Sequence, residues 1–513
     1  MTRTLYHFHG GVHPEGHKLA SSVRPIAVAP IPSQLVVPVH QHIGESARPC
    51  VTVGERVLKG QVIAQPEGYI SVAIHAPTSG VVTAIAPHAV PHPSDLLDMC
   101  IQIQPDGQDQ WIAHHPINYL NMAVSSLRNV LRDMGVAGLG GAVFPTFIKL
   151  HRGKAQKVPI LLLNGGECEP WITCDDLVMR ERSDEVLHGA AVMRHLLQAE
   201  HVLVGIEDNK PQAIAAMRAA AARMNFEVEV VSLPTLYPSG GTKQMIKVLT
   251  GREVPSGGRS TDAGVATFNV GTVLAVHRAI NHGEPMISRV MTLTGNVAQP
   301  QNYEVLLGTP MNELVKLAGA GSADVTGYVM GGPMMGIELS DLGVPVVKAS
   351  NCLLVKSAEL FPPPPDAMEC IRCTRCADVC PAELQPQALY WYARSNLLDK
   401  AQQYRLFDCI ECGCCSYVCP SHIPLVHYYR YAKSEIADKQ NGERAANHAR
   451  ERHEFRLARQ ERDEQERVAR LAQKAAAKPA LPGAEGGADQ AAIQAALART
   501  QPESTATPQS PRE

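Results

Sequence analysis

Eight cysteines near the C-terminal end of the chain stand in two runs with identical spacing. Each run reads C-x2-C-x2-C-x3-C-P, the spacing of bacterial ferredoxins that hold [4Fe–4S] clusters. The first run is Cys370, Cys373, Cys376, Cys380 and Pro381, and the second is Cys409, Cys412, Cys415, Cys419 and Pro420. Because such clusters carry single electrons, we predict that this chain transfers electrons one at a time.

The fourth cysteine of each run is expected to point away from the first three and to ligate the other cluster. We therefore assign one cluster to Cys370, Cys373, Cys376 and Cys419, and a second to Cys409, Cys412, Cys415 and Cys380. Zinc ribbons also use CxxC pairs, but not two runs of this form, so zinc is the weaker interpretation. Cys414 lies outside the spacing and is expected to bind no metal. Loss of iron should unfold this region, because the crossed ligation joins its two segments.

A glycine-rich loop in the first half of the chain could bind a phosphate. Gly138, Gly140 and Gly141 follow an expected helix, Ser125–Met134. The Rossmann fingerprint instead follows a strand and has its third glycine three residues after the second, where this chain has Val143. Backbone N–H groups of such a loop can still approach a phosphate closely. An ordinary packing turn is the alternative.

An acidic loop follows the strand expected at Val158–Leu163 and contains Asn164, Glu167 and Glu169. In an open α/β sheet, ligands bind beyond the carboxyl ends of the strands. Amide and carboxylate side chains at that place can hydrogen-bond ring nitrogens or sugar hydroxyls. A surface loop with ordinary carboxylates is the alternative interpretation.

The elements that must position these groups alternate between helix and strand. We expect helices over about Asp175–Leu197, Gln212–Met224 and Thr272–His282, and strands at His201–Ile206 and Glu227–Leu233. This alternation predicts a parallel sheet with helices packed against it.

Changes in composition divide the chain into several parts. We expect a β module at 1–115, an α/β domain at 116–285, short strands around a helix (Met311–Ala318) at 286–360, a cysteine domain at 367–432 and a tail at 436–513. The cysteine domain should contain a helix over Pro386–Leu406, and a stiff proline linker precedes it.

The tail is dense in arginine and glutamate, which predicts a solvated single helix. Asp463–Arg467 and Glu466–Arg470 are i,i+4 pairs that would support it. Beyond Lys478 the composition predicts disorder.

The overall composition is that of a globular protein, with 45% hydrophobic and 19% charged residues. A net charge of −3 gives no basic field that would indicate nucleic-acid binding. Met1–Gly11 lacks the apolar core of a signal peptide, and no run reaches the ~18 apolar residues that cross a bilayer. We therefore expect the reducing cytosol, where the 14 cysteines stay free to hold metal.

Four segments resemble, in order, the FMN- and NADH-binding segments of the flavoprotein subunit of respiratory complex I. They are Gly140–Thr146 with Lys149, Asn164–Pro170, Tyr237–Gly241 and Phe268–Thr272. Over about residues 5–435, the chain resembles the RnfC family, a component of the Rnf (Rsx) ion-translocating electron transport complex, and the opening Phe8–Lys18 matches that family closely. The resemblance implies an N-terminal barrel-sandwich hybrid, a Rossmann-like flavoprotein-type α/β domain, a β-grasp (SLBB-like) domain and a helical ferredoxin domain with two cubane clusters.

The resemblance also implies FMN on the glycine loop, with NADH stacked on the flavin. The implied cofactor-binding residues are Gly138, Gly140, Gly141, Lys149, Asn164, Glu167, Glu169, Tyr237, Asn269 and Thr272. Lys149 would lie near the phosphate, and Tyr237 would line the nicotinamide side. The two glutamates, near the isoalloxazine and the nicotinamide, are the expected catalytic residues.

The sequence departs from the complex I pattern at three places. Gly166 replaces an aspartate in the acidic loop, and Gly241 and Thr242 stand where complex I has paired glutamates. The two ferredoxin runs replace the C-terminal cysteine motif of complex I. These departures favour the Rnf family over complex I.

Two functions remain open at this stage. The first is a peripheral subunit on the cytoplasmic face of the cell inner membrane that transfers electrons between NADH and a partner iron–sulfur subunit, through FMN and two [4Fe–4S] clusters. Ion translocation would then belong to integral membrane subunits of the same complex. The second is a flavin-free relay that uses only the clusters, and the altered nicotinamide positions motivate it.

Overall fold

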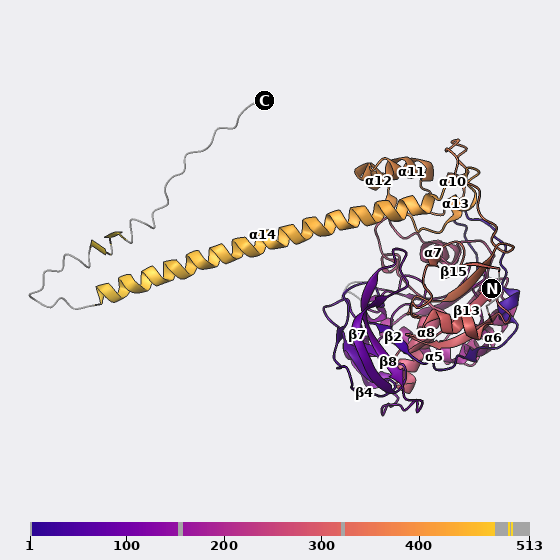
Figure 1. The fold of residues 1–513 in the computed structure, drawn as a ribbon, viewed down its shortest axis with the longest axis horizontal. Helices are drawn as coiled ribbons and strands as arrows, with labels where there is room; N and C mark the ends of the chain where they lie inside the picture. Colours follow the sequence, from indigo (N-terminus) through magenta and orange to yellow (C-terminus); the bar gives the residue numbers. More distant parts are fainter. Residues whose placement is uncertain (1–2, 152–156, 320–323, 478–490, 493, 496–513) are drawn as a thin grey trace, which may run out of the picture. The chain divides into compact units, whose positions relative to one another are not determined.

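The computed structural model describes residues 3–151, 157–319, 324–477, 491–492 and 494–495. It divides into two units, Met1–Lys433 and Ser434–Glu513. Within the first unit, strands at the N-terminal end, a mixed α/β region and a helical cysteine region follow one another along the chain (Figure 1). The expected fold class, α/β combined with β modules and a helical cysteine region, is confirmed.

A parallel four-stranded sheet forms the centre of the α/β region, in the order β11-β10-β9-β12. Its strands are β9 (Ile160–Gly165), β10 (His201–Glu207), β11 (Val228–Leu233) and β12 (Val265–Asn269). β9 and β10 are nearly continuous apolar runs, because a parallel sheet is buried on both faces. The expected strands are thereby confirmed.

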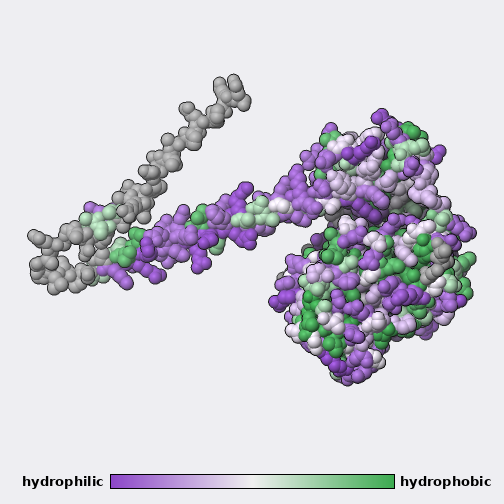
Figure 2. All heavy atoms as spheres, in the orientation of Figure 1, coloured by the Kyte–Doolittle hydropathy of each residue, from purple (hydrophilic) through white to green (hydrophobic). Residues whose placement is uncertain are grey.

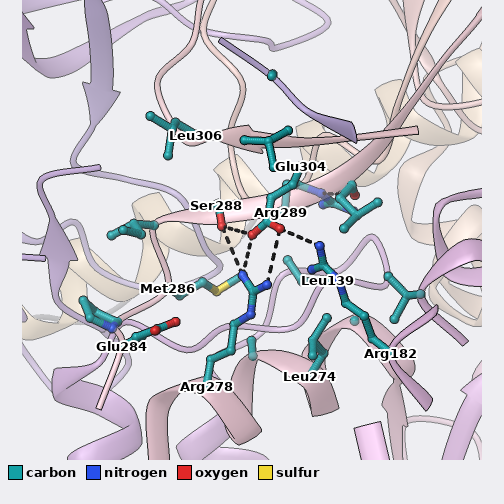
Figure 3. Close-up of a pocket in the computed structure, with 18 of the residues that line it drawn as sticks. Leu139, Arg182, Leu274, Arg278, Glu284, Met286, Ser288, Arg289, Glu304 and Leu306 are labelled. Carbon is teal, nitrogen blue, oxygen red and sulfur yellow. Dashed lines mark hydrogen bonds and ion pairs between the residues drawn. The ribbon is translucent and has the colours of Figure 1, made fainter. Parts of the chain in front are cut away.

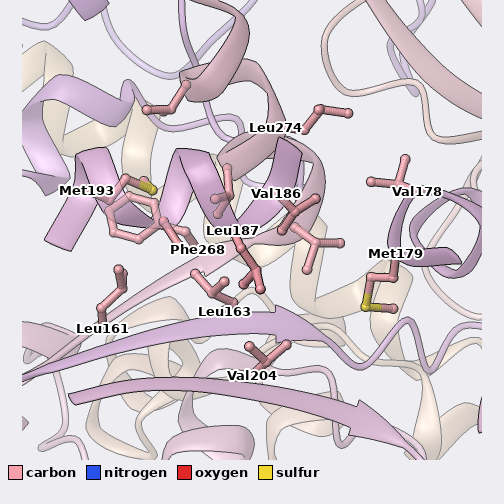
Figure 4. Packing of buried hydrophobic residues seen from close by; sticks show 14 of the residues in the cluster. Leu161, Leu163, Val178, Met179, Val186, Leu187, Met193, Val204, Phe268 and Leu274 are labelled. Carbon is pink, nitrogen blue, oxygen red and sulfur yellow. The ribbon is translucent and has the colours of Figure 1, made fainter. Parts of the chain in front are cut away.

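Helices cover both faces of this sheet. They are α2 (Val124–Asp133), α4 (Cys174–Glu181), α5 (Ser183–Leu197), α6 (Pro211–Ala221), α7 (Thr242–Thr250) and α8 (Val270–His277). On one face, Leu161, Leu163 and Phe268 of the strands pack beneath Val186 and Leu187 of α5 (Figure 4). α7 packs on the opposite face through buried methionine, isoleucine and leucine side chains.

The N-terminal module contains two small antiparallel sheets around one apolar core. The larger has the order β2-β8-β7-β4, and the smaller has the order β3-β5-β6. The strands are β2 (Leu35–Pro38), β3 (Arg48–Pro49), β4 (Arg56–Val57), β5 (Val62–Gln65), β6 (Ile74–His75), β7 (Gly80–Ala89) and β8 (Leu97–Pro105).

A six-stranded sheet follows the α/β region, in the order β1-β14-β13-β17-β15-β16. Its strands are β1 (Ala27–Val28), β13 (Ser288–Gly295), β14 (Gln301–Leu306), β15 (Val325–Met330), β16 (Ile337–Leu339) and β17 (Cys352–Ser357), and α9 (Met311–Leu317) packs against it. β1 pairs in parallel with β14. The start of the chain therefore contributes to this sheet, whereas the sequence groups it with the β module.

The cysteine region is built from short helices. They are α10 (Arg375–Asp378), α11 (Pro386–Arg394), α12 (Leu398–Gln403), α13 (Cys414–Tyr417) and the start of α14 (Leu425–Ala476). The remaining short elements of the first unit are α1 (Leu19–Ser22), α3 (Thr146–Lys149) and 3₁₀ turns at Tyr119–Asn121, Ser260–Ala263 and Leu406–Asp408.

Three expected helices differ from those observed. The helix expected at Asp175–Leu197 is two helices, because Arg182 leaves the helical conformation (φ −128°) and its guanidinium bonds Glu304 on β14. The helix expected at Pro386–Leu406 is also two, with Asn396 at φ +55° between them. α8 begins at Val270, and Arg278–His282 continues it as a π-helical turn.

Most of the described part of the second unit is the remainder of α14, which is almost entirely exposed beyond residue 440, and Figure 2 shows mostly hydrophilic side chains along it. Of the expected pairs, Glu466 and Arg470 lie 3.8 Å apart. The prediction that Asp463 pairs with Arg467 is wrong. Arg467 bonds Glu464 at 2.8 Å, and Arg459 lies 3.8 Å from Asp463. The disorder expected beyond Lys478 concerns residues that lie almost entirely outside the described ranges.

Replacing Leu163 with alanine should destabilise the α/β core. The side chain is fully buried on the central strand β9, so its loss removes apolar burial and leaves a cavity, at a cost of about 2–5 kcal/mol. Denaturant unfolding monitored by circular dichroism measures this. Leu120→Ala is the matched control, because Leu120 is 65% exposed, and it should change stability by less than ~0.5 kcal/mol. Equal effects of the two substitutions would contradict this packing.

Candidate functional site

The eight cysteines of the two runs line two separate cavities, four in each. Cys380, Cys409, Cys412 and Cys415 line one, which we call the inner cavity. Cys370, Cys373, Cys376 and Cys419 line the other, the outer cavity. Each cavity therefore draws three thiols from one run and the fourth from the other run. The four thiols that the two runs supply to each cavity match the four thiolates that a [4Fe–4S] cluster needs, and Cys414 is an additional thiol of the inner cavity.

The two runs adopt the same backbone conformation. Arg372 and Glu411, each two residues after the first cysteine of its run, both have φ +57°. Thr374 and Gly413, which follow the second cysteine, have φ +63° and +82°. These left-handed residues turn each loop tightly enough for its first three cysteines to face one cavity.

The cavities differ in their surroundings. Cys373 of the outer cavity is exposed, whereas Cys380, Cys412 and Cys415 of the inner cavity are buried. Burial raises the pKa of the Cys409 thiol to about 11. The Cys409 thiol therefore needs a cationic partner to become a thiolate, and cluster iron provides such a charge.

The inner cavity lies against the α/β region. The Tyr237 hydroxyl donates a hydrogen bond to the Cys412 carbonyl oxygen at 2.6 Å, and the Gln244 side-chain amide donates to the Pro381 carbonyl at 3.3 Å. The N-terminal segment also contacts the cysteine region, where the Gly11 amide donates to the Val379 carbonyl at 3.0 Å. A Cβ on Gly10 would lie 2.4 Å from the Val379 backbone, so only glycine fits this approach.

Two buried ammonium groups hold the acidic loop that follows β9. Lys18 donates to the carbonyls of Glu167, Glu169 and Ile172 at 2.6–2.9 Å. Lys210 donates to the Gly166 carbonyl at 2.9 Å and to the Glu207 carboxylate at 2.8 Å.

Both glutamates of the loop bind backbone groups. Glu167 accepts the amides of Asp175 and Asp176 at 2.6 and 3.2 Å, at the start of α4. Glu169 accepts the amides of Met334 and Met335 at 2.7 and 2.9 Å. Burial raises the pKa of Glu167, and the Lys18 ammonium opposes that shift. The expected catalytic carboxylates therefore brace the loop in this structure.

The glycine loop meets the start of α8. The Leu139 amide donates to the Thr272 hydroxyl at 2.8 Å, and a Cβ on Gly140 would lie 3.2 Å from the Cβ of Asn269. Asn269 caps α8 through the Gly271 amide (2.9 Å). Gly138 donates its amide to the Phe144 carbonyl at 2.9 Å. Gly140, Asn269 and Thr272 are thus brought together.

Gly141 faces open space. It has φ +93°, and a Cβ built there meets no atom within 4 Å. In the described part of the chain, the buried hydroxyls of Thr146 and Thr267 have no hydrogen-bond partner. The open space beside Gly141 leaves room for a phosphate-bearing cofactor.

Lys149 and Asn164 lie at the carboxyl edge of the parallel sheet. Lys149 donates to the Thr267 carbonyl at 2.5 Å and lies 4.5 Å from the centre of the Phe268 ring. Burial lowers its pKa to about 8. Asn164 is the register partner of Asn269 across β9 and β12, and its amide donates to the Gly240 carbonyl at 2.8 Å.

Tyr237 lies on the cluster side of this edge. Its ring is 2% exposed and packs with Val12, Cys412 and Cys414. Its hydroxyl, bound to Cys412, also lies close to the Glu169 carboxyl. The sequence places Tyr237 beside a nicotinamide, and in this structure the side chain points to the inner cavity instead.

A cavity of about 290 Å³ lies between the β module, α4, α8 and the six-stranded sheet. Arg182 and Arg278 both bind the Glu304 carboxylate inside it, beside Ser288 (Figure 3). Burial raises the pKa of Glu304, but the hydrogen bond and charge of Arg278 outweigh burial and hold that pKa at about 2.

This ion cluster and the roles of Lys18 and Lys210 were not predicted from the sequence. Lys18 ends the opening segment Phe8–Lys18, whose family resemblance was the available signal for it. Arg182, Arg278 and Glu304 belong to no motif and meet only through the fold.

Family models match the chain in four segments. They are a barrel sandwich hybrid domain of RnfC (residues 6–108), the Nuo51 FMN-binding domain (131–278), an SLBB domain (290–338) and a 4Fe-4S dicluster domain (369–423). These matches agree in order with the fold described above. Among the described residues, no helix combines the length and hydropathy needed to cross a membrane.

Several curated relatives are named as the C component of an ion-translocating oxidoreductase complex. The relative from Serratia proteamaculans is 46% identical over 497 residues, covering 96% of this chain and 69% of the relative. Those from Yersinia pestis and Pseudomonas aeruginosa are 46% and 47% identical, covering 79% and 91% of this chain. The chain spans only 65% and 60% of their lengths.

Among solved structures, an NAD+-reducing [NiFe]-hydrogenase in the H2-reduced state is similar, with a TM-score of 0.44 and 16% sequence identity. The match covers 63% of this chain and 63% of that chain.

Replacing Lys210 with methionine should destabilise the protein strongly. The substitution leaves the fully buried Glu207 carboxylate without its ammonium partner, which costs roughly 3–5 kcal/mol. Thermal unfolding measures the loss. The control is Lys247→Met, which breaks an ion pair with the exposed Glu253 and should lower the unfolding temperature far less, because solvent screens that pair. A Lys210→Met protein as stable as the control would disprove the supporting role of this ion pair.

Proposed function

Because this chain belongs to the RnfC family of ion-translocating oxidoreductase complexes, we propose that it is an electron-transfer subunit of such a complex. It transfers electrons between NADH and a partner iron–sulfur protein through FMN and two [4Fe–4S] clusters. The observation that carries this proposal is the inner cavity, where four cysteines lie directly against the FMN-type domain through Tyr237 and Gln244.

The residues proposed to hold FMN surround the carboxyl edge of the parallel sheet. The amides of Gly140 and Gly141 and the Lys149 ammonium would bind the phosphate, because they are donors of one loop region and Gly141 leaves open space there. Asn164 and Asn269, adjacent across β9 and β12, would face the ring system. Bound FMN would supply hydride exchange with NADH and single-electron exchange with the clusters.

Glu167 and Glu169 are proposed to act at the nicotinamide side, as the family resemblance implies. Both carboxylates have backbone partners in this structure, so their role would be to hold the loop that NADH approaches. Tyr237 would contribute on the opposite side of that loop, toward the inner cavity.

The two cavities suggest an order for electron flow. The inner cavity contacts the FMN-type domain, whereas the outer cavity has an exposed cysteine. We propose that electrons from NADH reach the inner cluster first and leave for a partner from the outer cluster. In the reverse direction the same residues would serve reduction of NAD.

The names of the relatives support a membrane-bound complex as the setting. We propose that this chain attaches peripherally at the cytoplasmic face of the inner membrane, through an iron–sulfur subunit and integral membrane subunits. Ion translocation would belong to the integral membrane subunits.

A flavin-free relay is the second candidate. Gly241 and Thr242 stand in place of the paired glutamates of complex I, and the backbone bonds of Glu167 occupy its carboxylate. These features favour a chain that carries electrons between other subunits without binding NADH.

Anaerobic reconstitution distinguishes the two candidates. The purified chain is given iron, sulfide and FMN, and its visible spectrum is recorded before and after NADH. We expect NADH to bleach both flavin and iron–sulfur absorption. Bleaching by dithionite but not by NADH would favour the relay.

Glu167→Gln is the companion variant for this assay. It should slow NADH oxidation at least tenfold while FMN and iron contents stay unchanged, because glutamine has one acceptor oxygen and loses one of the two backbone bonds that hold the loop. Unchanged turnover would remove Glu167 from the NADH site. Glu313→Gln, at a surface residue paired with Lys316, is the control and should leave turnover unchanged.

Serine variants of cysteines that line the same cavity should affect the same cluster, even where the cysteines belong to different runs. Cys380→Ser and Cys412→Ser should alter the same EPR signal of the reduced protein, and Cys419→Ser and Cys373→Ser should alter the other, because the cavities mix the runs. Cys50→Ser, at an exposed cysteine of the β module, should retain roughly eight iron atoms per chain. If Cys380→Ser instead matches Cys373→Ser, each run binds its own cluster.

A further inference from the structure

The second cysteines of the two runs, Cys373 and Cys412, lie in very different environments. Cys412 is 7% exposed and faces the α/β region, whereas its counterpart Cys373 is exposed. Two side chains that carry donor groups adjoin Cys412: the Tyr237 hydroxyl bonds its carbonyl oxygen, and Cys414 packs against it. The two loops otherwise share the same backbone turns, so the difference lies in what surrounds them.

The first donor is the Tyr237 hydroxyl. It bonds the Cys412 carbonyl oxygen at 2.6 Å, and the ring is 2% exposed. The N-terminal segment fixes the tyrosine, because its amide and carbonyl both pair with Val12 at 2.8–3.0 Å. The hydroxyl is therefore held at the inner cavity.

The second donor is the Cys414 thiol. It is fully buried and packs with Cys412 in one apolar cluster. It also lines the inner cavity without belonging to the cluster spacing. In the outer loop, Arg375 occupies the equivalent position, immediately before the third cysteine. A thiol donor at this position is thus specific to the inner loop.

The chemistry follows from the charge of a cluster. Reduction adds one negative charge, which burial in an apolar environment disfavours. Hydrogen bonds to the ligand sulfurs, or to the backbone that carries them, offset that cost and raise the reduction potential. A buried inner cluster without such donors would accept an electron less readily than an exposed outer one.

We propose that Tyr237 and Cys414 are positioning residues that raise the reduction potential of the inner cluster and so make it a competent electron acceptor beside the FMN-type domain. This inference deepens the proposed function and rests on it, since it takes the inner cavity to hold a cluster. It assigns to Tyr237 an electron-transfer role in place of a nicotinamide contact.

The test is an anaerobic redox titration of the reconstituted full chain, followed by EPR, in Tyr237→Phe and Cys414→Ala. The signals are assigned beforehand with Cys412→Ser and Cys373→Ser. We expect each variant to lower the midpoint potential of the inner cluster and to leave the outer one unmoved. A tenfold fall in the equilibrium constant for electron transfer to the inner cluster corresponds to about 59 mV for one electron.

Three further variants separate this effect from a structural one. Cys414→Ser keeps a donor and should retain the inner midpoint. Tyr417→Phe removes a hydroxyl from a side chain that is 55% exposed in the same loop, and it should change neither midpoint. Arg375→Ala alters the position equivalent to Cys414 in the outer loop and should leave the inner midpoint unchanged.

Unchanged inner midpoints in both Tyr237→Phe and Cys414→Ala would overturn the proposal. Loss of inner-cluster iron in both would overturn it as well, because the residues would then hold the cluster rather than tune it. The titration uses chemical mediators and dithionite, and so it does not depend on FMN or NADH. If the variants lower the inner midpoint but the chain never binds flavin, this inference holds. The proposed transfer of electrons from NADH through FMN would then be disproved.

Discussion

Two ammonium groups buried beneath one loop are the interactions on which much of the structure depends. The loop after β9 turns its backbone carbonyls inward, and Lys18 and Lys210 satisfy four of them. Buried carbonyls without donors would each cost free energy, so the two ammonium groups stabilise the loop. Because Lys18 comes from the start of the chain, the opening segment must cross the α/β region before the β module begins.

That loop also links the α/β region to the cysteine region. Glu169 binds the amides of Met334 and Met335 on the six-stranded side, and the Met334 carbonyl lies so close to Gly413 that a side chain there would clash. Tyr237 and the segment around Gly10 make the neighbouring contacts to the cysteine loops. The surroundings of the inner cavity are thus set by residues far apart in the sequence.

The cysteine spacing predicts the grouping of the first three thiols of each run because that geometry is local and needs only a few left-handed residues, and the ferredoxin spacing predicts that the fourth joins the other run. Helix ends were predicted less well, since the break at Arg182 depends on Glu304 more than one hundred residues away. The roles of Lys210, Tyr237 and Cys414 were missed for the same reason. Their residue types were visible in the sequence, but the partners that define their roles become neighbours only in the folded chain.

The mixing of the two runs has a consequence for biogenesis. The outer cavity needs Cys419 and the inner cavity needs Cys415, so neither has its full set of thiols until the end of the second run has left the ribosome. With the crossed ligation proposed above, a scaffold protein cannot deliver one cubane to a half-synthesised chain. Maturation of both centres therefore waits for the second run, and the two clusters are completed at nearly the same point of synthesis.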